Sequence, residues 1–186
     1  NGDTLDPTGL MAVGSRRENE IAAAAYIAET GRGWIESLSI ARRAFEEADR
    51  VLEKTAPSPL FVGSLEVLQF LWAAGLKLGI LSAATTSRVK EFVKYYQLGD
   101  YIQLEMGVEE GPSKPDPALF LQACQKLGVV PAAALMVGDS AGDIEMARRA
   151  GAAGCIGICA GKPEAAHLEA ADVAIAQLDE IQIVAS

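Results

Sequence analysis

The chain has 186 residues and a formal net charge of −9, from 16 Lys and Arg against 25 Asp and Glu. This length predicts one domain with at most a small appendage, and the 50% hydrophobic content excludes a disordered chain. No apolar run approaches the ~20 residues of a membrane span, and we expect no signal segment. The acidic balance argues against a nucleic-acid surface. Three cysteines are too few for a disulfide framework, so we expect a cytoplasmic protein.

Residues 1–58 predict helices and no strand. Ser15 followed by Glu18 is a capping box, which predicts a helix over 16–30. Beyond two glycines, apolar residues recur at spacings of three and four and predict a second helix over 34–54. Two prolines then close the region, because proline cannot continue a helix.

From residue 59 onward, predicted helices alternate with short apolar runs. This alternation is typical of right-handed crossovers and a mainly parallel sheet, so we expect a doubly wound α/β core over 59–186, preceded by a small helical region over 1–58. The predicted helices cover 64–74, 87–96, 117–127 and 142–150, and the predicted strands cover 76–81, 101–106, 134–137, 154–158 and 173–175.

Three polar clusters lie at or shortly after the ends of predicted strands. They are Ser82, the run Ser113-Lys114-Pro115-Asp116-Pro117, and the run Gly138-Asp139-Ser140-Ala141-Gly142-Asp143. Ligands of open parallel sheets bind beyond the carboxyl ends of the strands, so we expect these clusters to share one rim.

The residue types at this rim suit a phosphoryl group. Asp139 and Asp143 offer carboxylate oxygens, which Mg²⁺ prefers as ligands. Lys114 offers a point positive charge to a phosphate oxygen, and Ser82 offers a hydrogen bond to another. Together these groups are suited to stabilising a transferring phosphoryl group by position and charge.

Each cluster also has a purely structural interpretation. Ser82 fits an ordinary turn or cap residue. Asp116 fits an N-cap with Pro117 at the first helical position. Asp139 fits the start of the helix that carries Asp143, whose charge favours the helix dipole.

The chain resembles the haloacid dehalogenase-like (HAD) hydrolase superfamily, in particular its phosphoglycolate-phosphatase-like members. The resemblance covers nearly all of residues 59–186. Three segments carry it, corresponding to the second, third and fourth family motifs: Leu78-Gly79-Ile80-Leu81-Ser82, Ser113-Lys114-Pro115-Asp116-Pro117 and Val137-Gly138-Asp139-Ser140-Ala141-Gly142-Asp143.

This resemblance implies a Rossmann-like core and Mg²⁺-dependent hydrolysis of a small phosphorylated metabolite through an aspartyl-phosphate intermediate. It assigns Ser82 and Lys114 to the phosphoryl group. It assigns Asp139 to the metal and Asp143 to an acidic position beside it. Residues 1–58 correspond to the helical cap that such enzymes insert between their first and second motifs.

The family's first motif, which supplies the nucleophilic aspartate at the end of the first core strand, has only a weak counterpart. Gly2-Asp3-Thr4-Leu5-Asp6 imitates part of it with the glycine and aspartate exchanged, which makes Asp3 a weak candidate nucleophile. We expect instead that this stretch is a loop into the cap, and that the first core strand and the nucleophile lie upstream of the chain.

Several other residues have a functional and a structural interpretation. Arg16 and Arg17 either reach an acidic group of a substrate or form a solvated face. His167, the one histidine, is expected on the exposed surface. Cys155 and Cys159 are expected to be buried packing residues. Trp34 and Trp72, at helical spacing with other apolar residues, are expected in the core.

Two rival functions remain open. One is a 2-haloacid dehalogenase on the same fold, which the carboxylates of Asp139 and Asp143 disfavour because that reaction uses no metal. Ala83, after Ser82, also departs from the asparagine common in dehalogenases. The other is a catalytically inactive fragment or binding protein that retains the fold. The sequence leaves the substrate and the oligomeric state open.

Overall fold

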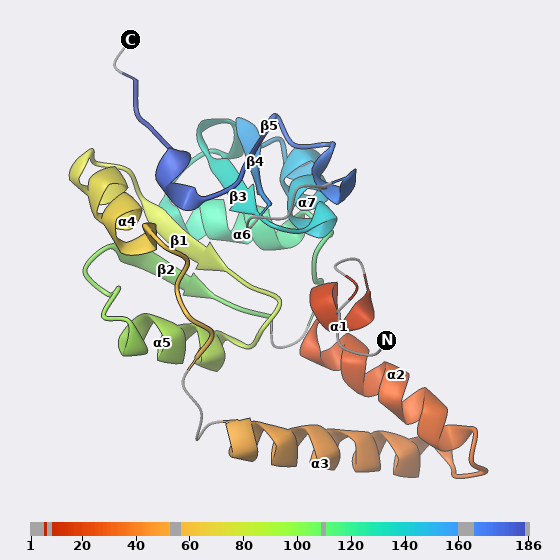
Figure 1. The fold of residues 1–186 in the computed structure, drawn as a ribbon. Helices are drawn as coiled ribbons and strands as arrows, with labels where there is room; N and C mark the ends of the chain where they lie inside the picture. The colour runs from red at the N-terminus through yellow and green to blue at the C-terminus, as the bar shows by residue number, and fades with distance from the viewer. Residues whose placement is uncertain (1–5, 7–8, 53–56, 109–110, 160–165, 185–186) are drawn as a thin grey trace.

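The computed structural model describes residues 6, 9–52, 57–108, 111–159 and 166–184. Helices α1 (Leu10–Val13), α2 (Arg16–Ala28) and α3 (Trp34–Leu52) come first, and α2 packs along α3. These three, the N-terminal helices, lie to one side of the other elements (Figure 1). The described part of residues 1–58 contains no strand, as predicted. None of the described helices is long and apolar enough to span a membrane.

The remaining elements alternate as the sequence predicts. The helices are α4 (Ser64–Ala73), α5 (Thr86–Tyr95), α6 (Ala118–Leu127) and α7 (Ala141–Ala150). The strands are β1 (Leu78–Leu81), β2 (Ile102–Met106), β3 (Leu135–Gly138), β4 (Gly154–Ile158) and β5 (Val173–Ile175). Three short 3₁₀ turns complete the series: η1 (Pro131–Ala133), η2 (Ala166–Leu168) and η3 (Leu178–Glu180).

Local signals account for the helix ends. The Ser15 hydroxyl accepts from Glu18 N at 3.3 Å, and the Glu18 carboxylate accepts from Ser15 N at 2.6 Å, which confirms the predicted capping box. Gly151 ends α7 in the left-handed conformation with φ of 77°, as its position predicted.

All strand pairs are parallel, but they form two sheets. β1 pairs with β2 in one sheet, and β3, β4 and β5 follow one another in the second. Among the described residues no ladder joins β1 to β3, so each of these strands has one unpaired edge. The α/β class with parallel sheets is therefore confirmed, and the ladder is interrupted in the middle.

An apolar core joins the two sheets despite the interruption. Helix α7 packs over β3 and β4, α6 packs over β1 and β2, and the two helices contact each other (Figure 1). The shared cluster contains Met106 from β2, Phe120 and Cys124 from α6, Met136 from β3 and Ile144 from α7. A second, smaller cluster of Val93, Leu98 and Ile102 lies where α5 meets β2.

The face of β3 turned away from that core is open. Met136 is buried, whereas Leu135 and Val137 on either side of it are 62% and 36% exposed. Because successive side chains of a strand point to opposite faces, β3 has one face packed on the helices and one in solvent.

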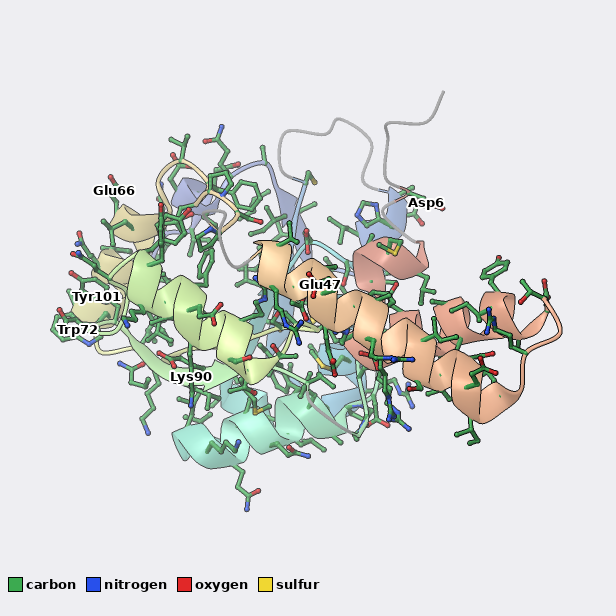
Figure 2. All side chains as sticks on the ribbon, turned by 90° about the horizontal axis from the view of Figure 1, so that it is seen from below. Asp6, Glu47, Glu66, Trp72, Lys90 and Tyr101 are labelled. Carbon is green, nitrogen blue, oxygen red and sulfur yellow. The ribbon has the colours of Figure 1, made fainter. Side chains whose placement is uncertain are left out.

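The expectation that both tryptophans lie in the core is wrong. Trp34 is 46% exposed and Trp72 is 47% exposed. Trp72 packs edge-on against Tyr101 with ring centroids 5.8 Å apart, at the outer edge of the molecule (Figure 2). Helical spacing showed which residues share a face, and that face is covered only in part.

The cysteines are free thiols. Cys155 is buried as predicted, whereas Cys159 is only half-buried. Burial raises the pKa of the Cys124 and Cys155 thiols, which leaves them protonated at neutral pH and unreactive.

Gly107 generates a prediction about the loop that follows β1. An added Cβ at Gly107 would lie 2.3 Å from the Ala84 carbonyl oxygen, a backbone atom that cannot turn away. We expect Gly107→Ala to lower the free energy of unfolding by about 1–3 kcal/mol, as overpacking does, measured by urea denaturation.

Gly99→Ala is the matched control, because a Cβ there meets no heavy atom within 4 Å. We expect it to change the unfolding free energy by less than about 0.5 kcal/mol. Equal stability of the two variants would contradict the close approach of Gly107 to the loop.

Candidate active site

Lys114 and Asp143 form an ion pair between the loop before α6 and the first turn of α7. Lys114 Nζ lies 2.5 Å from Asp143 Oδ1, and the side chains are only 13% and 4% exposed. The attraction between the two charges is therefore weakly screened by solvent. Asp143 Oδ1 makes no hydrogen bond of standard geometry among the described residues, so it depends on the lysine charge.

The other oxygen of Asp143 closes the N-terminus of α7. Asp143 Oδ2 accepts from Ser140 Oγ at 2.7 Å and from Ser140 N at 3.3 Å, while Ser140 Oγ accepts from Asp143 N at 3.2 Å. This is a second capping box, with an aspartate in the place of the usual glutamate. Both oxygens of Asp143 are thus engaged, and a direct bond to a metal would have to displace one of these partners.

Gly138, the last residue of β3, lets the strand end against this carboxylate. An added Cβ at Gly138 would lie 2.6 Å from both Cβ and Cγ of Asp143. Gly142 lies against Lys114 without such crowding, because its added Cβ would lie at an ordinary contact distance of 3.5 Å from Lys114 Cβ. The two glycines of the run from Gly138 to Asp143 are therefore the positions at which Asp143 and Lys114 approach the backbone.

Asp139 differs from Asp143, although the two lie on the same turn. Asp139 is exposed, and none of the described residues bonds to its carboxylate. Its backbone carbonyl lies 3.1 Å from His167 Nε2. His167 is half-buried over this turn, so the expectation that it is simply exposed surface is wrong. The two residues are 28 positions apart, and no spacing in the sequence indicates the contact.

Ser82 lies directly after β1, in the other sheet. Its backbone N–H donates to the Met106 carbonyl at 3.0 Å, and its Oγ accepts from Ala84 N at 3.1 Å. The predicted turn role of Ser82 is thus real. No contact among the described residues links its hydroxyl to Lys114 or Asp139. The structure thus pairs Lys114 with Asp143, in the helix that follows Asp139, and leaves Ser82 after a strand of the neighbouring sheet.

The loop that carries Lys114 is a tight turn. Asp116 N donates to the Ser113 carbonyl at 2.8 Å, and Asp116 Oδ1 accepts from Ala118 N at 2.8 Å. The predicted N-cap position of Asp116 is wrong by one residue, because α6 begins at Ala118 with Pro117 at the N-cap, although the Asp116 carboxylate still bonds the first helical N–H.

The open carboxylate of Asp139 suits a magnesium ion better than a metal held by protein side chains alone. The described residues contain no group of three or more His, Cys, Asp or Glu that could hold a metal. Magnesium is usually bound through one or two carboxylates together with water and substrate phosphate, so the open carboxylate of Asp139 fits it.

The arginines predicted as substrate contacts have different surroundings. Arg16 is engaged within the N-terminal helices: its guanidinium bonds Glu20 at 2.6 Å, pairs with Asp49 and lies 4.9 Å from the centre of the Phe45 ring. Burial lowers the pKa of Arg16, but the two carboxylates outweigh this effect and raise it. Arg17 is exposed and has no partner among the described residues. Asp3, the weak candidate nucleophile, lies outside the described residues.

Relatives with curated descriptions match about half of the chain. The phosphoglycolate phosphatase of Thiobacillus denitrificans is 37% identical over 100 residues, which cover 53% of this chain and 43% of that protein. This chain thus spans less than half the length of that relative.

Solved structures match more of the chain. A protein from Bacteroides fragilis assigned as a haloacid dehalogenase-like hydrolase superposes with a TM-score of 0.70 at 25% identity, over 88% of this chain and 81% of that one. A 2-haloacid dehalogenase from Pseudomonas syringae superposes with a TM-score of 0.60 at 25% identity, over 88% and 68%. The family model described as haloacid dehalogenase-like hydrolase matches residues 11–151, and so the chain belongs to this family.

Proposed function

We propose that the protein is a Mg²⁺-dependent phosphatase that hydrolyses a small phosphorylated metabolite through an aspartyl-phosphate intermediate. One observation carries this proposal: Lys114 Nζ is held 2.5 Å from Asp143 Oδ1, at the turn on which the carboxylate of Asp139 is exposed. A cation held at the turn that carries an open carboxylate suits a phosphoryl group together with its magnesium ion. The similarity to phosphoglycolate phosphatases makes phosphoglycolate the first substrate to test.

Each residue has a role that its surroundings support. Lys114 binds a phosphate oxygen and neutralises charge that develops in the transition state. Ser82 donates a hydrogen bond to a second oxygen. Asp139 is the metal ligand, and Asp143 is the acidic residue beside it that holds the lysine. Bound magnesium would supply positive charge to the transferring phosphoryl group.

The nucleophilic carboxylate, in this proposal, comes from residues that the structure does not describe or from a segment outside these 186 residues. The unpaired edges of β1 and β3 support this idea, because an added parallel strand would find backbone partners there. Such a strand would end near the turns of Ser82 and Asp139, where the phosphoryl group is proposed to bind.

The N-terminal helices serve as the cap, with a boundary between residues 58 and 59. Neither apolar cluster includes a residue of α1, α2 or α3, which supports a separate unit. Arg17, exposed at the start of α2, is the remaining candidate for contact with an acidic group of the substrate. Arg16 is already engaged by Glu20 and Asp49.

The proposal is tested by supplying the missing nucleophile. The chain is fused behind the first strand and motif of the Thiobacillus denitrificans relative, and hydrolysis of p-nitrophenyl phosphate and phosphoglycolate is measured with and without Mg²⁺. We expect turnover that requires both the added strand and the metal. A folded fusion protein that releases no phosphate from any ester tested would contradict the proposal.

In the same fusion protein, Asp139→Asn removes the open carboxylate. We expect kcat to fall by roughly 10²–10³-fold with no change in the unfolding midpoint, because the side chain is exposed and unbonded. Asp100→Asn, an exposed aspartate before β2, is the matched control and should retain full activity. Retained activity in Asp139→Asn would remove this residue from the metal site.

Asp143 gives a separate prediction about stability. In Asp143→Asn the amide still accepts from Ser140, but its NH₂ group faces the ammonium of Lys114. We expect the free energy of unfolding to fall by on the order of 3 kcal/mol, since a nearly buried ion pair is broken. Glu145→Gln is the control, because its pair with Arg149 on the same helix is more than half exposed and contributes at most about 1 kcal/mol. Equal losses in urea denaturation would show that the Lys114 pair is no stronger than a surface contact.

A 2-haloacid dehalogenase is the second candidate, and the superposition on the Pseudomonas syringae enzyme favours it. The open carboxylate of Asp139 counts against it, because that reaction uses no metal. Release of chloride from 2-chloropropionate by the fusion protein without added metal would reverse the ranking. The third candidate is a catalytically inactive fragment or binding protein that retains the fold, and the unpaired edges of β1 and β3 favour it.

A further inference from the structure

The N-terminal helices are attached to the rest of the protein by polar contacts rather than by a shared core. Ser113 Oγ donates to Glu18 Oε1 at 3.1 Å, and Arg88 on α5 lies 3.2 Å from Asp49 on α3. Figure 2 shows α3 lying across the molecule beside α5. Since neither apolar cluster contains a residue of α1–α3, these two contacts have a large influence on where the helices lie.

Glu18 cannot move independently of α2. One carboxylate oxygen accepts from Ser15 N at 2.6 Å and from Ser15 Oγ at 2.7 Å, and the other accepts from Ser113. Burial raises the pKa of Glu18, but the hydrogen bonds from Ser15 and Ser113 outweigh it and lower the pKa below its usual value. The residue that caps α2 therefore also bonds the neighbouring loop.

That loop carries Lys114. Ser113 immediately precedes Lys114, and the turn is closed by the bond from Asp116 N to the Ser113 carbonyl. A displacement of Ser113 therefore moves the backbone of Lys114, whose ammonium must reach Asp143. The position of α2 is in this way linked to the geometry of the lysine.

Asp49 makes the second attachment. It pairs with Arg16 from α2 and with Arg88 from α5, so the same carboxylate holds the N-terminal helices together and ties them to α5. Burial alone would raise the pKa of Asp49. The Arg16 and Arg88 guanidinium groups have the larger, opposite effect and lower the pKa below its usual value, so the carboxylate is charged at neutral pH.

We propose that Glu18 is a positioning residue for Lys114: through Ser113 it sets the lysine loop when α2 is seated, and the Asp49–Arg88 pair keeps α2 and α3 seated. The inference deepens the proposed phosphatase function by naming contacts through which the N-terminal helices act on the reacting lysine. The proposal predicts that the loop carrying Lys114 is ordered in part by its contact with α2.

Hydrogen–deuterium exchange of the native chain tests the proposal without any activity. Ser113→Ala removes the contact with Glu18, and Arg88→Gln removes the contact with Asp49. Both changed residues lie outside the N-terminal helices, so the Ser15 capping box and the Arg16–Asp49 pair stay intact. We expect exchange in residues 111–118 to rise severalfold in Ser113→Ala, up to about fivefold for one such contact, and to rise further in the double variant. Exchange of residues 111–118 at the wild-type rate in both Ser113→Ala and the double variant would overturn the proposal.

Substitutions at Glu18 separate positioning from a local effect of the serine. Glu18→Ala should raise exchange in residues 111–118 as Ser113→Ala does, whereas Glu18→Gln, which still completes a capping box, should restore most of the protection. Faster exchange in Ser113→Ala but not in Glu18→Ala would overturn the role of Glu18. Ser39→Ala and Arg32→Gln, exposed changes confined to the N-terminal helices, are the matched controls and should leave the segment unchanged.

The kinetic consequence is measured separately in the fusion protein. Ser113→Ala should lower kcat more than it raises KM, because the lysine acts on the transition state. If the fusion protein is inactive, the proposed function fails, while the exchange experiment still decides the role of Glu18. If it is active and Ser113→Ala changes neither constant while exchange rises, the coupling to Lys114 is overturned.

Discussion

The ion pair between Lys114 and Asp143 is the interaction on which the organisation of the site depends. It joins a loop that follows β2, in one sheet, to a helix that follows β3, in the other. No ladder joins the two sheets among the described residues, so this contact and the core beneath α6 and α7 bring them together. The cost of removing both charges from water offsets much of their attraction, so a nearly buried pair of this kind contributes little net stability. Its main effect is to fix the positions of Lys114 and Asp143 relative to each other.

Asp139 and Asp143 show how one turn gives two carboxylates different properties. The four-residue spacing places Asp139 before the helix and Asp143 in its first turn. Asp143 is turned inward by the Ser140 capping box and the lysine, while Asp139 stays in solvent. The inward carboxylate is bonded to Ser140 through one oxygen and paired with Lys114 through the other. The outward one keeps its full capacity for a ligand.

The sequence predicted the features of the fold that depend on neighbouring residues. The Ser15–Glu18 capping box, the glycine end of α7 and the alternation of helices with parallel strands are encoded within a few positions, and all are present. Apolar runs do not predict the interrupted ladder, because they identify strands without naming their partners. Only the family resemblance, with its weak first motif, led us to expect that the first core strand lies upstream of the chain. The half-exposed Trp72 was not predictable either, since helical periodicity shows which residues share a face but not what packs against that face.

The prediction of the site shows the same division. Motif spacing predicted Lys114, Asp139 and Asp143 as site residues, and the structure pairs Lys114 with Asp143, in the helix that follows Asp139. It did not distinguish the buried carboxylate from the open one, because that difference depends on a lysine 29 positions away and on Gly138, which has no room for a Cβ. Nor did it indicate that His167 contacts the Asp139 carbonyl or that Glu18 contacts Ser113.

These long-range contacts differ in strength, and the difference has a mechanical consequence. The core beneath α6 and α7 is apolar and buried, so α7 and β3 hold Asp143 rigidly. Glu18 and Asp49 attach the N-terminal helices through groups that water can also solvate, and such contacts break at a small cost in free energy. A lysine that is tied at its charged end to the rigid part and at its backbone to the movable part responds to motion of the helices, while the carboxylate it meets stays in place.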